Sequence, residues 1–120
     1  MPSKAYHQAL DRVRDLCLAL PETREVEAWG HPTFRAGKKM FAGFGEHVGD
    51  LTLGLSVGHQ RQAELLTDDR FFPTPYAARL GWVSTRIDSR TNWDELAALV
   101  IEAYRQVALK RMLKALDGIQ

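Results

Sequence analysis

Residues 51–57, LTLGLSV, constrain the fold most, because large apolar side chains alternate strictly with small or polar ones. Successive side chains of a β-strand point to opposite faces of a sheet, so this alternation is typical of a strand with one buried face and one open face. Residues 82–88 alternate in the same way, which places Trp82 and Arg86 together on one face of a further strand. We therefore expect a sheet that is covered on one side.

Helical periodicity marks both ends of the chain. Apolar residues between positions 6 and 20 recur every three or four residues, which predicts an amphipathic helix with Ser3 as its N-cap. A last helix is expected to begin near Thr91 or Asn92 and to continue to Leu113. Helices before and after the strands, with no repeat or linker, predict an α+β fold.

The region before the strand at residues 82–88 is less regular. Residues 58–67 predict a short helix, and the following segment to Gly81 contains Pro73 and Pro75, which interrupt regular structure. An irregular connection is expected there, and it is the best candidate for a binding loop or lid.

Composition limits the classes of function. A chain of 120 residues with 45% hydrophobic residues can form one core, so a single domain over residues 1–120 is expected. The formal net charge of +1 means that any nucleic-acid binding must depend on local clusters of charge. The only cysteine, Cys17, excludes an internal disulfide and is expected to be buried on the first helix. No apolar run is long enough to span a bilayer, so we expect a cytoplasmic protein with no membrane partner.

Residues 31–45, HPTFRAGKKMFAGFG, carry the strongest functional signal. If the apolar residues share the core face, antiparallel pairing sets Phe34 opposite Met40 and Arg35 opposite Lys39, around a three-residue loop. A two-residue loop would pair Phe34 with Lys39 and mix the faces. The longer loop is therefore the prediction.

That register turns Arg35, Lys39 and Phe41 away from the core, so that an aromatic ring lies among cations on the open face. The predicted contact residues are Arg35, Lys38, Lys39, Phe41, Trp82 and Arg86. In the first hypothesis the partner is DNA, with cations against phosphates and Phe41 or Trp82 stacked on a base. In the second, the same face binds a protein. Charge that only keeps exposed strands soluble is the remaining alternative.

Catalysis and metal binding receive little support. The chain has no G-x-S-x-G elbow, and its four histidines show no metal-binding spacing. Residues 43–49, GFGEHVG, lack the spacing of a nucleotide-binding loop, and a hairpin turn explains their glycines better. A pocket beneath the loop from Phe71 to Gly81 is the one enzymatic alternative, and it would need convergent polar groups. We expect a protein that is not an enzyme.

In order and spacing, GHPTFRAGKKMFAGF, LTLGLSV, GWVSTRID and WDELAALVIEAYRQVALKRM resemble the MmcQ/YjbR-like family. The resemblance extends over nearly the whole chain and implies a CyaY-like fold, with a helix from each end of the chain on one face of an antiparallel sheet. It also implies DNA binding through a "double wing" of hairpins, one of which would include residues 34–44. It implies no cofactor and no catalytic residues. The related frataxin fold would suggest iron, but the first helix has no acidic ridge, so we expect no metal site.

Overall fold

The structure is a computed structural model that describes residues 3–119. A six-stranded antiparallel sheet has the strand order β1-β2-β3-β4-β6-β5. In chain order the elements are α1 (Lys4–Leu18), β1 (Thr23–Ala28), β2 (His31–Ala36), β3 (Lys39–His47), β4 (Asp50–Ser56), α2 (His59–Leu65), β5 (Phe71–Pro73), the 3-10 turn η1 (Ala78–Leu80), β6 (Trp82–Arg86), α3 (Trp93–Val107) and α4 (Lys110–Ile119).

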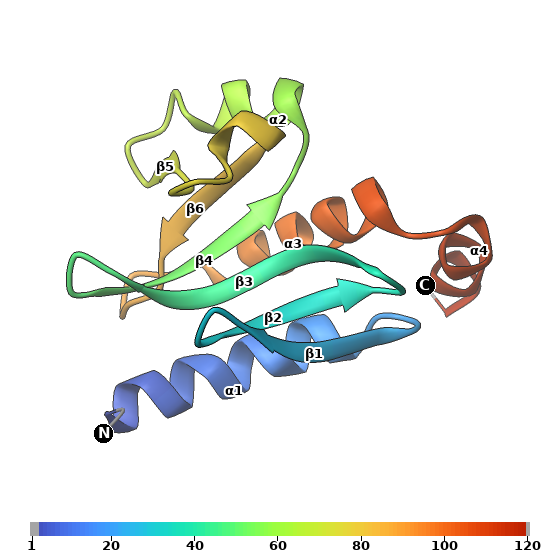
Figure 1. The fold of residues 1–120 in the computed structure, drawn as a ribbon, viewed down its shortest axis with the longest axis horizontal. Helices are drawn as coiled ribbons and strands as arrows, with labels where there is room; N and C mark the ends of the chain where they lie inside the picture. Colours follow the sequence, from blue (N-terminus) through green and yellow to red (C-terminus); the bar gives the residue numbers. More distant parts are fainter. Residues whose placement is uncertain (1–2, 120) are drawn as a thin grey trace.

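Helices α1 and α3 pack on the same side of the sheet, and β1 to β4 form consecutive hairpins beside them (Figure 1). We call this side the helix face and the other side the open face. The predicted α+β architecture, with helices from both ends of the chain on one side of an antiparallel sheet, is confirmed.

Both long helices begin where the sequence predicts. The hydroxyl of Ser3 accepts a hydrogen bond from the backbone N–H of Tyr6 at 3.1 Å, and the Asn92 side chain accepts one from Glu95 at 3.1 Å. These caps satisfy donors that the first helical turn leaves free. Cys17 is fully buried on the apolar side of α1, as expected.

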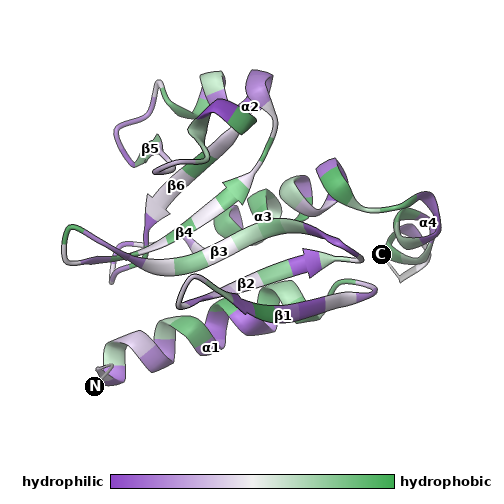
Figure 2. Ribbon diagram, viewed as in Figure 1, coloured by the Kyte–Doolittle hydropathy of each residue, from purple (hydrophilic) through white to green (hydrophobic). Residues whose placement is uncertain are grey.

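Aromatic pairs join the helix face of β3 to the two helices. Phe41 meets Tyr104 of α3 edge-to-face, with ring centroids 5.6 Å apart, and Phe44 meets Tyr6 of α1 at 5.2 Å. The Tyr104 hydroxyl donates to the carbonyl of Pro21 at 2.7 Å, so this buried ring has no unsatisfied polar group. In Figure 2 hydrophobic segments of β3 and β4 run alongside α3.

The C-terminal helix differs from the prediction of one continuous element. α3 ends at Val107, Ala108 is extended (φ −67°, ψ 145°), and α4 starts at Lys110. The break redirects the chain so that Met112 and Leu116 become buried. Because burial of two large apolar side chains offsets the loss of helical hydrogen bonds, tertiary packing overrides helix propensity here.

The predicted register of the β2–β3 hairpin is wrong. Ala36 pairs with Lys39 and Arg35 with Met40, around a two-residue turn that begins with Gly37 at φ 63°. Positive φ at the first central residue, and only there, is typical of a type II′ turn. The ladder then shifts between Phe34 and Arg35, so that β3 contains one extra residue, a β-bulge.

Candidate functional site

A groove of about 780 Å³ crosses the open face of the sheet. We call it the open-face groove. Its lining residues are Ala28, Trp29, His31, Thr33, Gly43, Phe44, Gly45, Glu46, His47, Thr52, Gly54, Thr74, Pro75, Tyr76, Ala77, Leu80, Trp82 and Ser84. The volume falls within the usual range of about 300–1,000 Å³ for ligand pockets. The groove has the dimensions of a binding site.

Glycines on β3 and β4 keep the floor of the groove low. Gly43 pairs with Gly54 across the two strands, and Gly45 lies on the same side of β3 as Gly43. A Cβ on Gly43 would meet only the Thr33 methyl group at 4.0 Å. Gly43 therefore leaves bare backbone at the centre of the groove. The expectation that a turn explains residues 43–49 is wrong for Gly43 and Gly45, which lie inside β3.

The other two glycines let the walls approach the sheet closely. A Cβ on Gly45 would lie 2.8 Å from His31 Nδ1, so the imidazole rests on the β3 backbone. A Cβ on Gly54 would lie 3.3 Å from the Thr74 methyl group, and the Thr74 hydroxyl is 2.8 Å from that of Ser84. The β5–β6 connection is therefore held against β4 and β6 as one wall, and His31 belongs to the other.

Two aromatic side chains stand exposed on the opposite walls. Trp29 in the β1–β2 turn is 88% exposed and Tyr76 in the β5–β6 connection is 100% exposed. Both have left-handed backbone, with φ 52° and 65° respectively. That conformation costs a bulky residue roughly 1–2 kcal/mol. Glu22 and Val48 share this conformation, so what distinguishes Trp29 and Tyr76 is that it presents two aromatic rings to solvent.

The lining carries few charges. No Lys, Arg or Asp is present, and the single acidic residue, Glu46, pairs with Leu51 and alternates with the open-face residues Gly45 and His47, so its side chain belongs to the helix face. The Thr33 hydroxyl donates to the Val26 carbonyl within the sheet. The groove is therefore a largely aromatic surface with no Lys, no Arg and no carboxylate on the open face.

Trp82 and Arg86 lie on the open face of β6, but only Trp82 lines the groove. The Arg86 guanidinium forms an ion pair with Asp50 at 3.1 Å and lies 5.4 Å from the centre of the Phe72 ring. The His47 ring is stacked on the Phe72 ring, with the ring centroids 5.5 Å apart. Asp50 therefore neutralises the cation that was predicted to bind a phosphate.

Phe41 contradicts the prediction that it faces the open side. It is 0% exposed and packs against Tyr104. Lys39 is on the helix side as well, because it pairs with the buried Ala36, so Arg35 and Lys39 lie on opposite faces. The cause is the β-bulge, which breaks the apparent alternation of Met40, Ala42 and Phe44.

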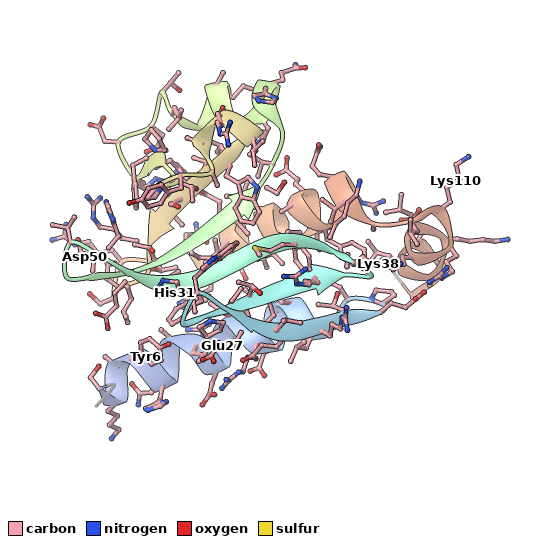
Figure 3. The ribbon with its side chains drawn as sticks, in the orientation of Figure 1. Tyr6, Glu27, His31, Lys38, Asp50 and Lys110 are labelled. Atoms are coloured by element: carbon pink, nitrogen blue, oxygen red, sulfur yellow. The ribbon has the colours of Figure 1, made fainter. Side chains whose placement is uncertain are left out.

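The remaining cations of the hairpin lie at its turn. The Arg35 guanidinium donates to the Lys38 carbonyl at 3.3 Å and so helps to close the turn. The turn rests on α4, since a Cβ on Gly37 would lie 2.8 Å from Met112 Cε. Figure 3 shows Lys38 and Lys110 toward the same end of the molecule, far from Asp50. We call Lys38, Lys39, Lys110 and Lys114 the basic end. None of the four forms an ion pair within residues 3–119.

Sequence reasoning missed Trp29, Tyr76 and the glycine floor. The signals were present: glycines at positions 43, 45 and 54 fall on alternate positions of expected strands, where a glycine usually marks a close approach to the backbone. Trp29 precedes Gly30, in the position where a two-residue hairpin turn ordinarily has Asn. A large ring in that position departs from the residues that such a turn ordinarily has.

Cys17 is buried, and burial raises the pKa of its thiol to about 12, which makes it a poor nucleophile. Within the described part of the chain, no group of three or more His, Cys, Asp or Glu side chains is arranged to hold a metal ion. None of the helices in residues 3–119 is long and apolar enough to cross a membrane.

Comparisons with known proteins identify the fold and the family. The crystal structure of Deinococcus radiodurans protein DR2400, whose domain is designated DUF419, is similar with a TM-score of 0.72 and 23% identity, over 90% of this chain and 87% of that one. A Pseudomonas syringae protein from structural genomics gives 0.65 and 14%, over 84% and 97%. No curated protein matches. The YjbR family model matches residues 18–106, and the chain therefore belongs to the YjbR family.

Proposed function

We propose that this protein is a binding module that receives an extended segment of a partner protein in its open-face groove. The observation that carries the proposal is the pair of exposed aromatic residues, Trp29 and Tyr76, on opposite walls of an uncharged groove. Trp, Tyr and Arg are the side chains that most often dominate the energy of protein interfaces.

The distribution of exposed apolar residues supports the same surface. Trp29, Tyr76 and Leu80, at 61% exposure, all line the groove. Contiguous apolar surface that remains exposed on a folded protein marks interaction sites. The walls are also fixed in position, since Thr74 and His31 rest on strand glycines. A rigid site loses little conformational entropy when it binds.

Gly43 provides a direct test. It is outside the left-handed region and a Cβ there meets nothing closer than 4.0 Å, so Gly43→Val should fold normally while its side chain fills the floor of the groove. Random peptides displayed on phage are selected against the natural protein and then tested on the variant. Peptides that bind the natural protein and lose about tenfold or more in affinity on Gly43→Val are expected. Selection that yields only peptides indifferent to Gly43→Val contradicts the proposal.

A second candidate function is nucleic-acid binding, and the basic end favours it. Lys38 and Lys110 lie toward one end of the molecule in Figure 3, and Lys39 belongs to the same hairpin as Lys38 and Lys114 to the same helix as Lys110, α4. Such a set would contact phosphates without reading sequence, because base recognition needs groups that reach base edges. Figure 2 marks the adjoining ends of β2 and β3 as hydrophilic.

The two candidates make different predictions about salt and charge. Duplex and single-stranded DNA are titrated at two salt concentrations, with the double variant Lys38→Glu and Lys39→Glu in parallel. DNA binding at the basic end should weaken steeply with salt. The logarithm of the binding constant should fall with the logarithm of the salt concentration by roughly 0.9 per phosphate contact on duplex DNA, and the charge reversals should abolish binding. Peptide binding in the groove should survive them. Absence of DNA binding at low salt removes the second candidate.

A further inference from the structure

We infer that the segment bound by the open-face groove is rich in proline and adopts the polyproline II conformation. The inference rests on the proposed function and adds the chemistry of the occupant. Three properties of the groove lead to it: the pairing of its floor, its charge, and the polarity of its hydrogen-bonding groups.

The floor cannot extend its sheet onto a ligand. β3 is paired with β2 and β4, and β4 is paired with β3 and β6, so the backbone groups beneath the groove already have partners in the sheet. A peptide that binds as an added strand needs a free sheet edge. The occupant must therefore be a segment whose backbone has no need of a strand partner, and polyproline II is the extended conformation that meets this condition.

Charge complementarity selects an uncharged occupant. The groove lining has no Lys, Arg or Asp, and the side chain of Glu46 belongs to the helix face. Arg86, beside the groove, is already paired with Asp50 at 3.1 Å. A phosphopeptide, an acidic segment or a nucleic-acid backbone would therefore find no Lys or Arg there, only His31 and His47, and a basic segment would find no carboxylate.

The aromatic side chains of the lining supply several hydrogen-bond donors. The indole N–H groups of Trp29 and Trp82 and the hydroxyl of Tyr76 can donate to a ligand, and indole has no acceptor. Among the floor hydroxyls, Thr33 already donates to a backbone carbonyl. Proline contributes a carbonyl acceptor but no N–H, so a proline-rich segment presents acceptors with few donors left unpaired.

The shape of the groove agrees with this chemistry. Rings rise from both walls, and bare backbone at Gly43 lies between them, so apolar rings of a ligand can pack between the aromatic faces. Aromatic-lined grooves recognise polyproline II because the ligand is already ordered before it binds. A decaproline peptide is accordingly the simplest probe.

The three tryptophans allow a matched measurement. Trp29 and Trp82 line the groove, whereas Trp93 lies beneath Arg12, 4.2 Å from the guanidinium carbon, outside it. Decaproline is titrated into the 15N-labelled protein while the three indole N–H signals are followed by NMR. Saturable shifts of the Trp29 and Trp82 signals are expected, with that of Trp93 unchanged. A glycine-serine peptide of equal length should produce no such shifts.

Variants separate the possible outcomes. Gly43→Val should weaken decaproline binding about tenfold or more, whereas Val48→Asn, at an exposed turn outside the lining, should leave it unchanged. Absence of saturable shifts, or shifts centred away from the groove, overturns the inference. If the phage selection yields groove-dependent peptides without proline, the proposed function stands and the inference fails. If it yields no groove-dependent peptides and decaproline does not bind, both fail.

Discussion

On the helix face, Phe41 and Phe44 are buried edge-to-face against tyrosines of α3 and α1, whereas on the open face Trp29 and Tyr76 remain almost wholly in solvent. The backbones differ as well. Beneath the helices the strands carry bulky side chains, whereas beneath the groove they carry glycines and hydroxyl residues.

The contrast indicates which residues serve stability and which are available for a ligand. Burial of Phe41 removes a large apolar surface from water, so this ring contributes to the free energy of unfolding. Exposure of Trp29 and Tyr76 in left-handed conformations costs free energy instead. Residues that lower stability and remain accessible are expected where binding depends on them.

The largest expected effect is on the helix face. Phe41→Ala should lower the free energy of unfolding by about 3–5 kcal/mol, because it leaves a cavity beside Tyr104. Tyr76→Ala should change it by no more than about 0.5 kcal/mol, because that side chain is fully exposed. Urea denaturation of both variants measures the difference. Equal losses of unfolding free energy in the two variants would contradict the distinction between a stabilising helix face and an open face that contributes little to stability.

Alkaline pH provides the second test of the helix face. Burial raises the pKa of Cys17 to about 12, so the folded state keeps the thiol protonated when the unfolded chain has ionised. The contribution of Cys17 is therefore fully present below about pH 8.5 and is lost as pH rises toward 12, by on the order of 1–2 kcal/mol near pH 10. Denaturation at several pH values compares the natural protein with Cys17→Ala, which should show a flatter decline. An identical dependence of the unfolding free energy on pH in the two proteins would contradict the assignment of this loss of stability to Cys17.

A matched pair of glycines sharpens the description of the open face. Gly45→Ala places a methyl group 2.8 Å from His31 Nδ1, so the imidazole must move, at an expected cost of about 1 kcal/mol in stability. Gly43→Ala should have no cost, because a Cβ there meets only the Thr33 methyl group at 4.0 Å. Thermal denaturation gives the stabilities, and NMR reports whether the His31 signals shift only in the first variant. The reverse order of stabilities would refute this account of the floor.

The smallest expected effect is a gain in stability, whereas most substitutions destabilise a protein. Trp29→Asn should stabilise the protein by roughly 0.5–1 kcal/mol, because Asn tolerates the left-handed conformation that a two-residue turn requires. It should also weaken peptide binding in the groove. Val48, at φ 51° in the β3–β4 turn, is the control, since Val48→Asn should stabilise similarly and leave binding intact. Loss of stability in Trp29→Asn would mean that Trp29 packs as part of the fold.

Much of the fold could be predicted from the sequence. The N-cap residues Ser3 and Asn92 and the burial of Cys17 follow from local patterns, and the structure has all three as expected. Periodicity could not reveal the break after Val107, because the burial of Met112 that favours it depends on a hairpin distant in sequence. Nor could it reveal the extra residue in β3, so Phe41 was assigned to the wrong side.

The candidate site was predicted less well than the fold. Trp82 was placed on the open face of its strand, and it lines the groove. The walls were missed because they form by tertiary approach: Thr74 and His31 lie on glycines of other strands. A count of cations along the chain also could not anticipate that Asp50, distant in sequence, pairs with Arg86.

The extra residue in β3 lets the hairpin meet two requirements at once. Phe41 packs against Tyr104 on the helix face, and the strands keep their pairing on either side of the bulge. Arg35 pairs with Met40 on one side of the irregularity, and Phe34 pairs with Ala42 on the other. A hairpin without residue 41 would regain an uninterrupted ladder and keep Gly43 opposite Thr33, but it would leave a void above Tyr104. The extra residue thus fills the space beside Tyr104 on the helix face, and the side chains of the open face can change without altering that packing.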